Sequence, residues 1–242
     1  MSWLALLLVG VGLTDLVRPA TTRLTAGCSG AAAALLLGLL AGLTSWPDAL
    51  AYVAVAGVVL TWALTSGVGR RRAWVPLAVL GSAVLLAVLT AAWAPAVDGP
   101  VTDWLEASPW RWLSGADPDV ALLTLGGVLV QLATGNVVVR LVLAATGSDQ
   151  PQPAGPRALK GGRLLGPMER LVILGLGLAG HVTAASLVIA AKGLVRWPEL
   201  QSFRSADGSS DGPSIDEVTE YFLVGSFVSW LVSLGTLAVV VA

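Results

Sequence analysis

The stretch that decides the fold class runs from Arg170 to Lys192 and reads RLVILGLGLAGHVTAASLVIAAK. Between these two cations every residue is apolar or small except His181, and the run is too long for a buried strand. At a rise of 1.5 Å per residue, a helix of this length covers ~33 Å, close to the thickness of the hydrocarbon layer of a membrane. The stretch therefore predicts one transmembrane helix, with Arg170 and Lys192 at its two borders and His181 near the midplane.

His181 is eleven residues from each of the two cations, so all three side chains share one stripe of the predicted helix. In one interpretation, Arg170 and Lys192 anchor the helix at the two interfaces, and His181 hydrogen-bonds a neighbouring helix. In the other, His181 faces a polar cavity and binds a ligand or relays protons, because ionisable groups in mid-membrane are functional candidates. The residues alone leave both interpretations open.

The composition of the whole chain places it among integral membrane proteins. Of its 242 residues, 55% are hydrophobic and only 12% are charged, and the mean hydropathy is +0.80. A net charge of −1 and dispersed basic residues give no indication of nucleic-acid binding. With one cysteine, Cys28, and one histidine, a Cys/His zinc site is excluded. We predict no metal, no other cofactor and no catalytic residue.

Hydrophobic runs along the chain predict an all-α polytopic bundle of about seven transmembrane spans, or six if the first segment is re-entrant. Residues 1–146 form an N-terminal five-span region, whose acidic, tryptophan-rich outer connector covers 98–119. Residues 147–164 form a basic cytoplasmic loop, and 165–242 form a C-terminal two-span unit. The positions of lysine and arginine favour an amino terminus outside and a carboxyl terminus in the cytoplasm. The predicted spans are 2–17, 24–44, 49–67, 74–97, 120–146, 170–192 and 219–241.

Three of these spans carry polar residues that can pair. Asp15 and Arg18 stand three residues apart at the end of the first span, where they can form an ion pair. The fifth span carries Gln131, Asn136 and Arg140, which either knit helices together or line a solute path. The seventh span carries a row of small hydroxyl residues on one helix face, which predicts a helix–helix contact. This row comprises Ser226, Ser229, Ser233 and Thr236.

Three stretches in the last third of the chain carry a resemblance to a known family. They are GPMERLVI at 166–173, AAKGLVRWPEL at 190–200 and EYFLVGSFVSWL at 220–231. With them the chain resembles an uncharacterised bacterial membrane-protein family, domain of unknown function 3307, which is often encoded beside SatD-like proteins. The resemblance implies a bacterial inner (plasma) membrane and no established activity. It directs attention to Glu169, Arg170, Lys192, Arg196 and Glu220 as a set.

These five residues predict two alternative arrangements. If the sixth and seventh spans are an antiparallel pair, Lys192 lies at the same membrane border as Glu220, and an ion pair is expected there. Glu169 and Arg170 then pair with Arg140 or with each other. In the alternative arrangement, Lys192 and Arg196 form a cationic pocket for a lipid headgroup or an anionic solute.

We therefore expect an integral inner-membrane protein that acts without covalent catalysis. It either serves as an assembly or accessory subunit, with protein partners in the membrane, or handles a small solute or ion; membrane lipids are its other partners. Transport predicts a water-accessible lumen containing His181, Gln131 and Asn136, whereas an assembly role predicts these groups hydrogen-bonded in a dry bundle. The alternative is an intramembrane enzyme or an anionic-lipid-binding protein that uses His181, Lys192 and Arg196.

Overall fold

The computed structural model describes residues 1–67, 72–147, 162–192, 194 and 215–242, and these residues form helices and turns with no β-strand among them. The predicted all-α fold is confirmed. Five helical segments are long and apolar enough to cross a membrane, as a membrane-embedded protein requires: Ser2–Ala20, Arg23–Leu40, Trp46–Thr65, Pro118–Thr146 and Thr219–Val241. Trp74–Leu89 and Val182–Lys192 are shorter apolar helices. The predicted count of about seven spans is therefore not confirmed.

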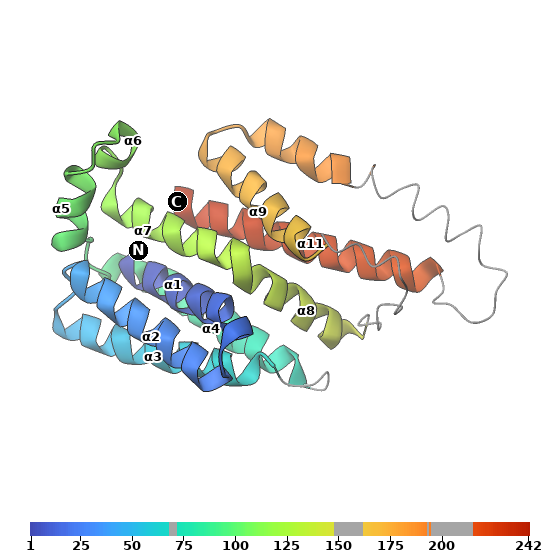
Figure 1. The fold of residues 1–242 in the computed structure, drawn as a ribbon, viewed down its shortest axis with the longest axis horizontal. Helices are drawn as coiled ribbons and strands as arrows, with labels where there is room; N and C mark the ends of the chain where they lie inside the picture. The colour runs from blue at the N-terminus through green and yellow to red at the C-terminus, as the bar shows by residue number, and fades with distance from the viewer. Residues whose placement is uncertain (68–71, 148–161, 193, 195–214) are drawn as a thin grey trace.

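The helices run back and forth along one long axis (Figure 1). The first four are α1 (Ser2–Val17, continued by the 3₁₀ turn η1, Arg18–Ala20), α2 (Arg23–Leu40), α3 (Trp46–Thr65) and α4 (Trp74–Leu89, followed by the 3₁₀ turn η3, Ala91–Trp93). The connector contains the short helices α5 (Pro100–Glu106) and α6 (Arg111–Ser114). Next comes a continuous rod of α7 (Pro118–Leu129), the π-helix η4 (Val130–Thr134) and α8 (Gly135–Thr146). The last part contains α9 (Gly162–Leu178), the Val182–Lys192 helix and α11 (Ile215–Val241).

Local signals in the sequence start two of the spanning helices. At α3, the backbone N–H of Ser45 donates to Asp48 Oδ2 at 2.9 Å, which forms one half of a capping box, and Pro47 occupies the first turn. At α7, the carboxylate of Asp117 accepts hydrogen bonds from the N–H groups of the first turn, with Pro118 as the first helical residue. These caps determine the residues at which α3 and α7 begin.

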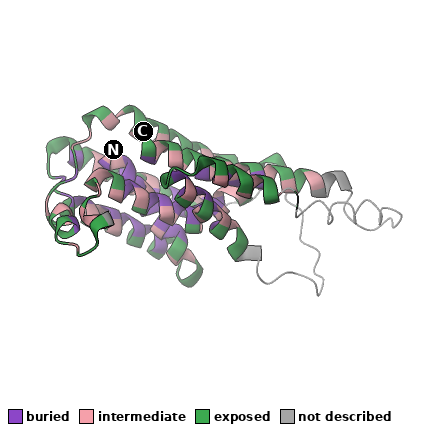
Figure 2. Ribbon diagram, turned by 90° about the horizontal axis from the view of Figure 1, so that it is seen from above, coloured by how far each residue is buried: buried purple, intermediate pink, exposed green. Residues whose placement is uncertain are grey.

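Helix α1 is the centre of the bundle and packs against α2, α3 and α7. Most of its residues are buried, and buried residues gather on the inner faces of the helices (Figure 2). Glycines let the backbones approach: a Cβ on Gly12 would lie 2.6 Å from Leu129 Cβ, and a Cβ on Gly30 would clash with the Thr14 hydroxyl. Close backbone approach through small residues is the usual packing mode of helices in membranes.

The predicted single helix from Arg170 to Lys192 is wrong, because α9 ends at Leu178 and a second helix starts at Val182. Gly180 has φ +77°. The N–H of His181 donates to the carbonyl of Leu176 at 2.8 Å, and that of Gly180 to Gly177 at 3.0 Å. This is a Schellman turn, which a glycine in the left-handed region permits. His181 consequently lies exposed in a turn, off the predicted stripe.

Both ends of the chain lie at the same end of the bundle (Figures 1 and 2). The amino group of Met1 lies 3.5 Å from Asp119 Oδ1, at the start of α7. The turn at Gly180 adds one reversal of direction to the chain, which brings the two ends together. The sides of the membrane on which the termini lie stay a prediction. We call this end the acidic end; it holds Asp48, Asp98, Asp103, Glu106, Asp117 and Asp119, with Arg111.

Candidate functional site

A buried arginine forms the centre of the most polar region inside the bundle. Arg170 of α9 is 1% exposed, and its guanidinium donates to acceptors on two other elements. Nε and Nη2 both donate to the backbone carbonyl of Gln131, at 3.2 and 3.0 Å. Nη2 also donates to Asn136 Oδ1 at 2.7 Å, and Nη1 donates to Ser229 Oγ at 3.2 Å. Arg170 therefore ties α9 to the α7–α8 rod and to α11.

The π-helix in the α7–α8 rod creates the acceptor side of this region. Gln131 and Asn136 are five residues apart, so a regular α-helix would separate them by about 140°. A π-helix has i→i+5 hydrogen bonds, so the relative direction of these two residues differs from that in an α-helix. The acceptors are the backbone carbonyl of Gln131 and the side-chain oxygen of Asn136. Gly135 gives the guanidinium room, because a Cβ there would lie 2.6 Å from Arg170 Nε. Both residues are site candidates from the sequence, but nothing in the sequence indicates that one cation binds both.

The side chain of Gln131 extends the network to α11. Gln131 is fully buried, and its Nε2 donates to Thr236 Oγ1 at 2.9 Å. The hydroxyl of Ser233 donates to Gln131 Oε1 at 3.3 Å. The hydroxyl row on α11 thus makes a helix–helix contact, as predicted. We call this region the Arg170 cluster; it comprises Gln131, Asn136, Arg170, Ser229, Ser233 and Thr236.

An ion pair lies beside the Arg170 cluster. Lys192 pairs with Glu169, whose other carboxylate oxygen accepts a hydrogen bond from Trp230 Nε1 at 2.9 Å. Lys192 Nζ also lies 6.0 Å from the centre of the Trp230 ring, within cation–π range. The predicted Lys192–Glu220 pair is therefore wrong, since the Gly180 turn folds the Val182–Lys192 helix back along α9 and brings Lys192 to Glu169.

The remaining predicted site residues lie elsewhere. The exposed His181 ring makes no hydrogen bond to any residue that the structure describes. Arg140 donates only a long bond, 3.4 Å, to the carbonyl of Asn136, and so does not pair with Glu169. Arg196 lies outside the described residues. Across the described ranges, no group of three or more His, Cys, Asp or Glu side chains could hold a metal ion.

A second buried charge lies at the far end of α1. Asp15 pairs with Arg18 at 3.0 Å, which confirms the predicted i,i+3 ion pair. Its other oxygen, Oδ2, accepts a hydrogen bond from Trp62 Nε1 at 2.9 Å. Trp62 is fully buried on α3. The hydrogen bond between Asp15 and Trp62 joins α1 to α3. The sequence predicted the ion pair of Asp15 but not this contact with Trp62.

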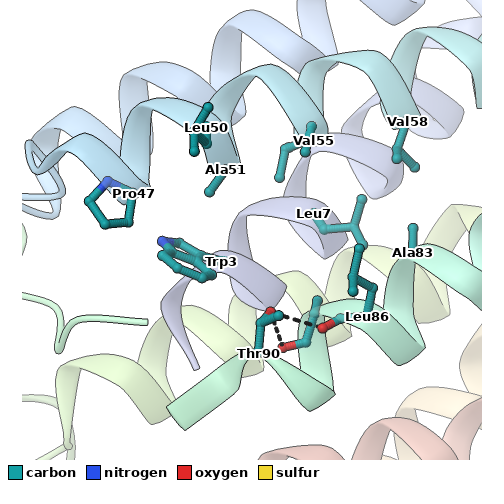
Figure 3. Close-up of a pocket in the computed structure, with 12 residues that line it drawn as sticks. Trp3, Leu7, Pro47, Leu50, Ala51, Val55, Val58, Ala83, Leu86 and Thr90 are labelled. Atoms are coloured by element: carbon teal, nitrogen blue, oxygen red, sulfur yellow. Dashed lines mark hydrogen bonds between the residues drawn. The ribbon is translucent and has the colours of Figure 1, made fainter. Parts of the chain in front are cut away.

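An apolar groove of about 320 Å³ lies between α1, α3 and α4 (Figure 3). Its two polar edges are already paired: Trp3 Nε1 donates to Asp48 at 2.7 Å, and the Thr90 hydroxyl donates to the carbonyl of Leu86 at 2.8 Å. The groove thus offers apolar contact and no directional recognition. The other lining residues are Leu7, Pro47, Leu50, Ala51, Ala54, Val55, Val58, Ala83, Leu86 and Ala87.

Fold and site together define an all-helical bundle of long apolar helices, fastened internally by an arginine-centred hydrogen-bond network. No family model, curated protein or solved structure matches this chain. The resemblance of residues 166–231 to a bacterial membrane-protein family therefore stays a prediction.

Proposed function

We propose that this chain is an integral protein of the bacterial inner membrane that acts without covalent catalysis, as an assembly or accessory subunit. The single observation that carries the proposal is the closure of the Arg170 cluster. Its donors and acceptors bind one another across α7–α8, α9 and α11. Polar groups used in this way stabilise a helix bundle.

A transport path requires polar groups that face water, and the burial of the cluster argues against one. Gln131 and Ser233 are both fully buried, and Arg170 is almost so. His181, which the transport interpretation places in the same lumen, lies in the exposed turn after α9. An enzyme built on His181 would need a carboxylate or hydroxyl partner for its ring, and Asp15 is already bound to Arg18 and Trp62.

The distribution of charge supports an orientation with the acidic end outside. The opposite end, which we call the basic end, holds Arg18, Arg23, Arg72 and Arg140 among the described residues. Helix α11 also begins at this end, with Asp216, Glu217 and Glu220. Lysine and arginine are retained on the cytoplasmic side of membrane proteins. We therefore propose that both termini lie outside, so that the carboxyl terminus differs from its sequence-based assignment to the cytoplasm.

Thiol accessibility tests the proposal. In a Cys28→Ser background, single cysteines replace Ser233 in the cluster, Ala107 at the acidic end and Thr21 at the basic end. Ser233→Cys replaces one oxygen by a slightly larger sulfur in a fully buried side chain. Intact cells are labelled with a membrane-impermeant maleimide, and then again after permeabilisation.

We expect Ala107→Cys to react in intact cells, Thr21→Cys to react only after permeabilisation, and Ser233→Cys to react only after denaturation. Reaction of Ser233→Cys in folded protein reveals a water-filled path and replaces the assembly role by transport. A reversed pattern for the two end positions reverses the orientation and leaves the assembly role in place.

A further inference from the structure

Three arginines gather at the basic end of the bundle. Arg18 begins η1, Arg23 begins α2, and Arg140 belongs to α8. Arg18 and Arg23 stand on either side of the short link between α1 and α2, and α1 packs against η4, which leads into α8. Among the described residues the only carboxylate paired with any of them is Asp15, which binds Arg18. One carboxylate against three guanidinium groups leaves a local excess of positive charge.

Most donors of these three guanidinium groups have no protein acceptor within the described part of the chain. A guanidinium carries five N–H donors in a planar fork. Arg18 Nε is buried without a hydrogen-bond partner. Arg23 makes one long bond, 3.3 Å, to the carbonyl of Gly67, and Arg140 makes one of 3.4 Å to Asn136. Arg170 shows the contrast, because all three of its nitrogens donate.

The position of Arg140 specifies where an acceptor is needed. It lies six residues before the end of α8, about 9 Å inside a segment long enough to span a membrane. It is exposed there, and an exposed arginine on a spanning helix is costly unless its guanidinium reaches water or an anion at the headgroup level. The positive end of the α2 dipole, at Arg23, adds to the attraction for an anion.

Apolar neighbours make a lipid a better occupant than a free anion. Leu16 and Leu24, which flank Arg18 and Arg23 in the sequence, are 47% and 59% exposed. They offer contact for acyl chains directly beside the cations. Guanidinium groups bind phosphate oxygens in a bidentate manner, and basic pockets between helices on the cytoplasmic side bind anionic headgroups.

We propose that Arg18, Arg23 and Arg140 form a binding site for the phosphate group of an anionic phospholipid in the cytoplasmic leaflet. This site is separate from the Arg170 cluster and does not depend on the assembly role. It rests on the proposed orientation, in which the basic end lies at the cytoplasmic surface of the membrane.

Native mass spectrometry of the full-length protein in an uncharged detergent tests the site. Phosphatidylglycerol and phosphatidylcholine are titrated separately, and bound lipid is counted. We expect phosphatidylglycerol to bind at least about tenfold more tightly than phosphatidylcholine. Arg140→Gln and Arg23→Gln, tested separately, should each abolish this preference for phosphatidylglycerol. Arg111→Gln, an exposed arginine at the acidic end, should leave the preference unchanged.

Two outcomes overturn the proposal. Equal binding of the two lipids, or an equal loss of the preference in Arg111→Gln, shows that the basic end has no site selective for an anionic phospholipid. Displacement of phosphatidylglycerol by millimolar inorganic phosphate shows that the arginines hold a free anion and not a lipid. Size-exclusion chromatography confirms that each variant is folded and monodisperse before it is titrated.

Discussion

Replacing Arg170 by methionine is the most direct test of the Arg170 cluster. Methionine keeps a long, flexible side chain of similar reach but donates no hydrogen bond. The substitution removes the four hydrogen bonds that the guanidinium donates to Gln131, Asn136 and Ser229. It also leaves the buried carbonyl of Gln131, which accepts two of these hydrogen bonds, without its donor.

The expected loss of stability follows from these contacts. Interhelical hydrogen bonds in membranes are worth about 0.6 kcal/mol each on average, so four give about 2.4 kcal/mol. An unsatisfied buried acceptor adds about 1 kcal/mol. We therefore expect Arg170→Met to lower the free energy of unfolding by about 2–4 kcal/mol. Arg170→Lys, which keeps the charge but not the planar fork, should fall between methionine and wild type.

The assay is reversible unfolding in mixed micelles with increasing sodium dodecyl sulfate, followed by tryptophan fluorescence. Arg111→Met is the matched control, because Arg111 is exposed on α6 at the acidic end. The opposing view is that the desolvation cost of a buried charge exceeds the gain from its bonds. If Arg170→Met unfolds at the same denaturant concentration as Arg111→Met, or a higher one, the cluster does not stabilise the bundle and our reasoning fails.

Two glycine substitutions test the close approaches in the same unfolding assay. Gly135→Ala places a Cβ 2.6 Å from the Arg170 guanidinium. We expect this overpacking to lower the free energy of unfolding by about 1–3 kcal/mol. In the control, Gly175→Ala on α9, the new Cβ meets open space, so the change should be neutral or slightly stabilising. In Gly30→Ala the new Cβ clashes with backbone and side-chain atoms of α1, so the loss of stability should be at least as large as in Gly135→Ala. In its control, Gly57→Ala on α3, the Cβ meets open space. Equal stability of the two variants within either pair contradicts the packing that we describe.

The sequence predicts most of the helices, because a hydropathy run of sufficient length has few alternatives in a membrane protein. It also predicts contacts between residues close in sequence or on one regular face, such as Asp15 with Arg18 and the hydroxyl row on α11. These depend only on α-helical periodicity, which holds over both segments.

The sequence could not predict features that break this periodicity. The GLGLAG stretch before His181 is compatible with a continuous transmembrane helix, where glycine is common, and with the turn that the structure has at Gly180. Because the turn was not predicted, both the position of His181 and the ion-pair partner of Lys192 were predicted wrongly. Likewise, nothing in residues 130–134 distinguishes a π-helix from an α-helix, so the meeting of Gln131 with Asn136 around one cation stayed hidden.

The wide sequence separation within the Arg170 cluster has a consequence for biosynthesis. Gln131 and Asn136 leave the ribosome before Arg170, whereas Ser229 and Trp230 follow it by about sixty residues. Chains are synthesised from the amino terminus and their early segments fold first. Until α11 is inserted, Arg170 therefore lacks its Ser229 acceptor and Glu169 lacks its Trp230 donor. A nascent chain halted before residue 229 lacks the serine acceptor of Arg170 Nη1, so the last helix completes the hydrogen bonding of α9.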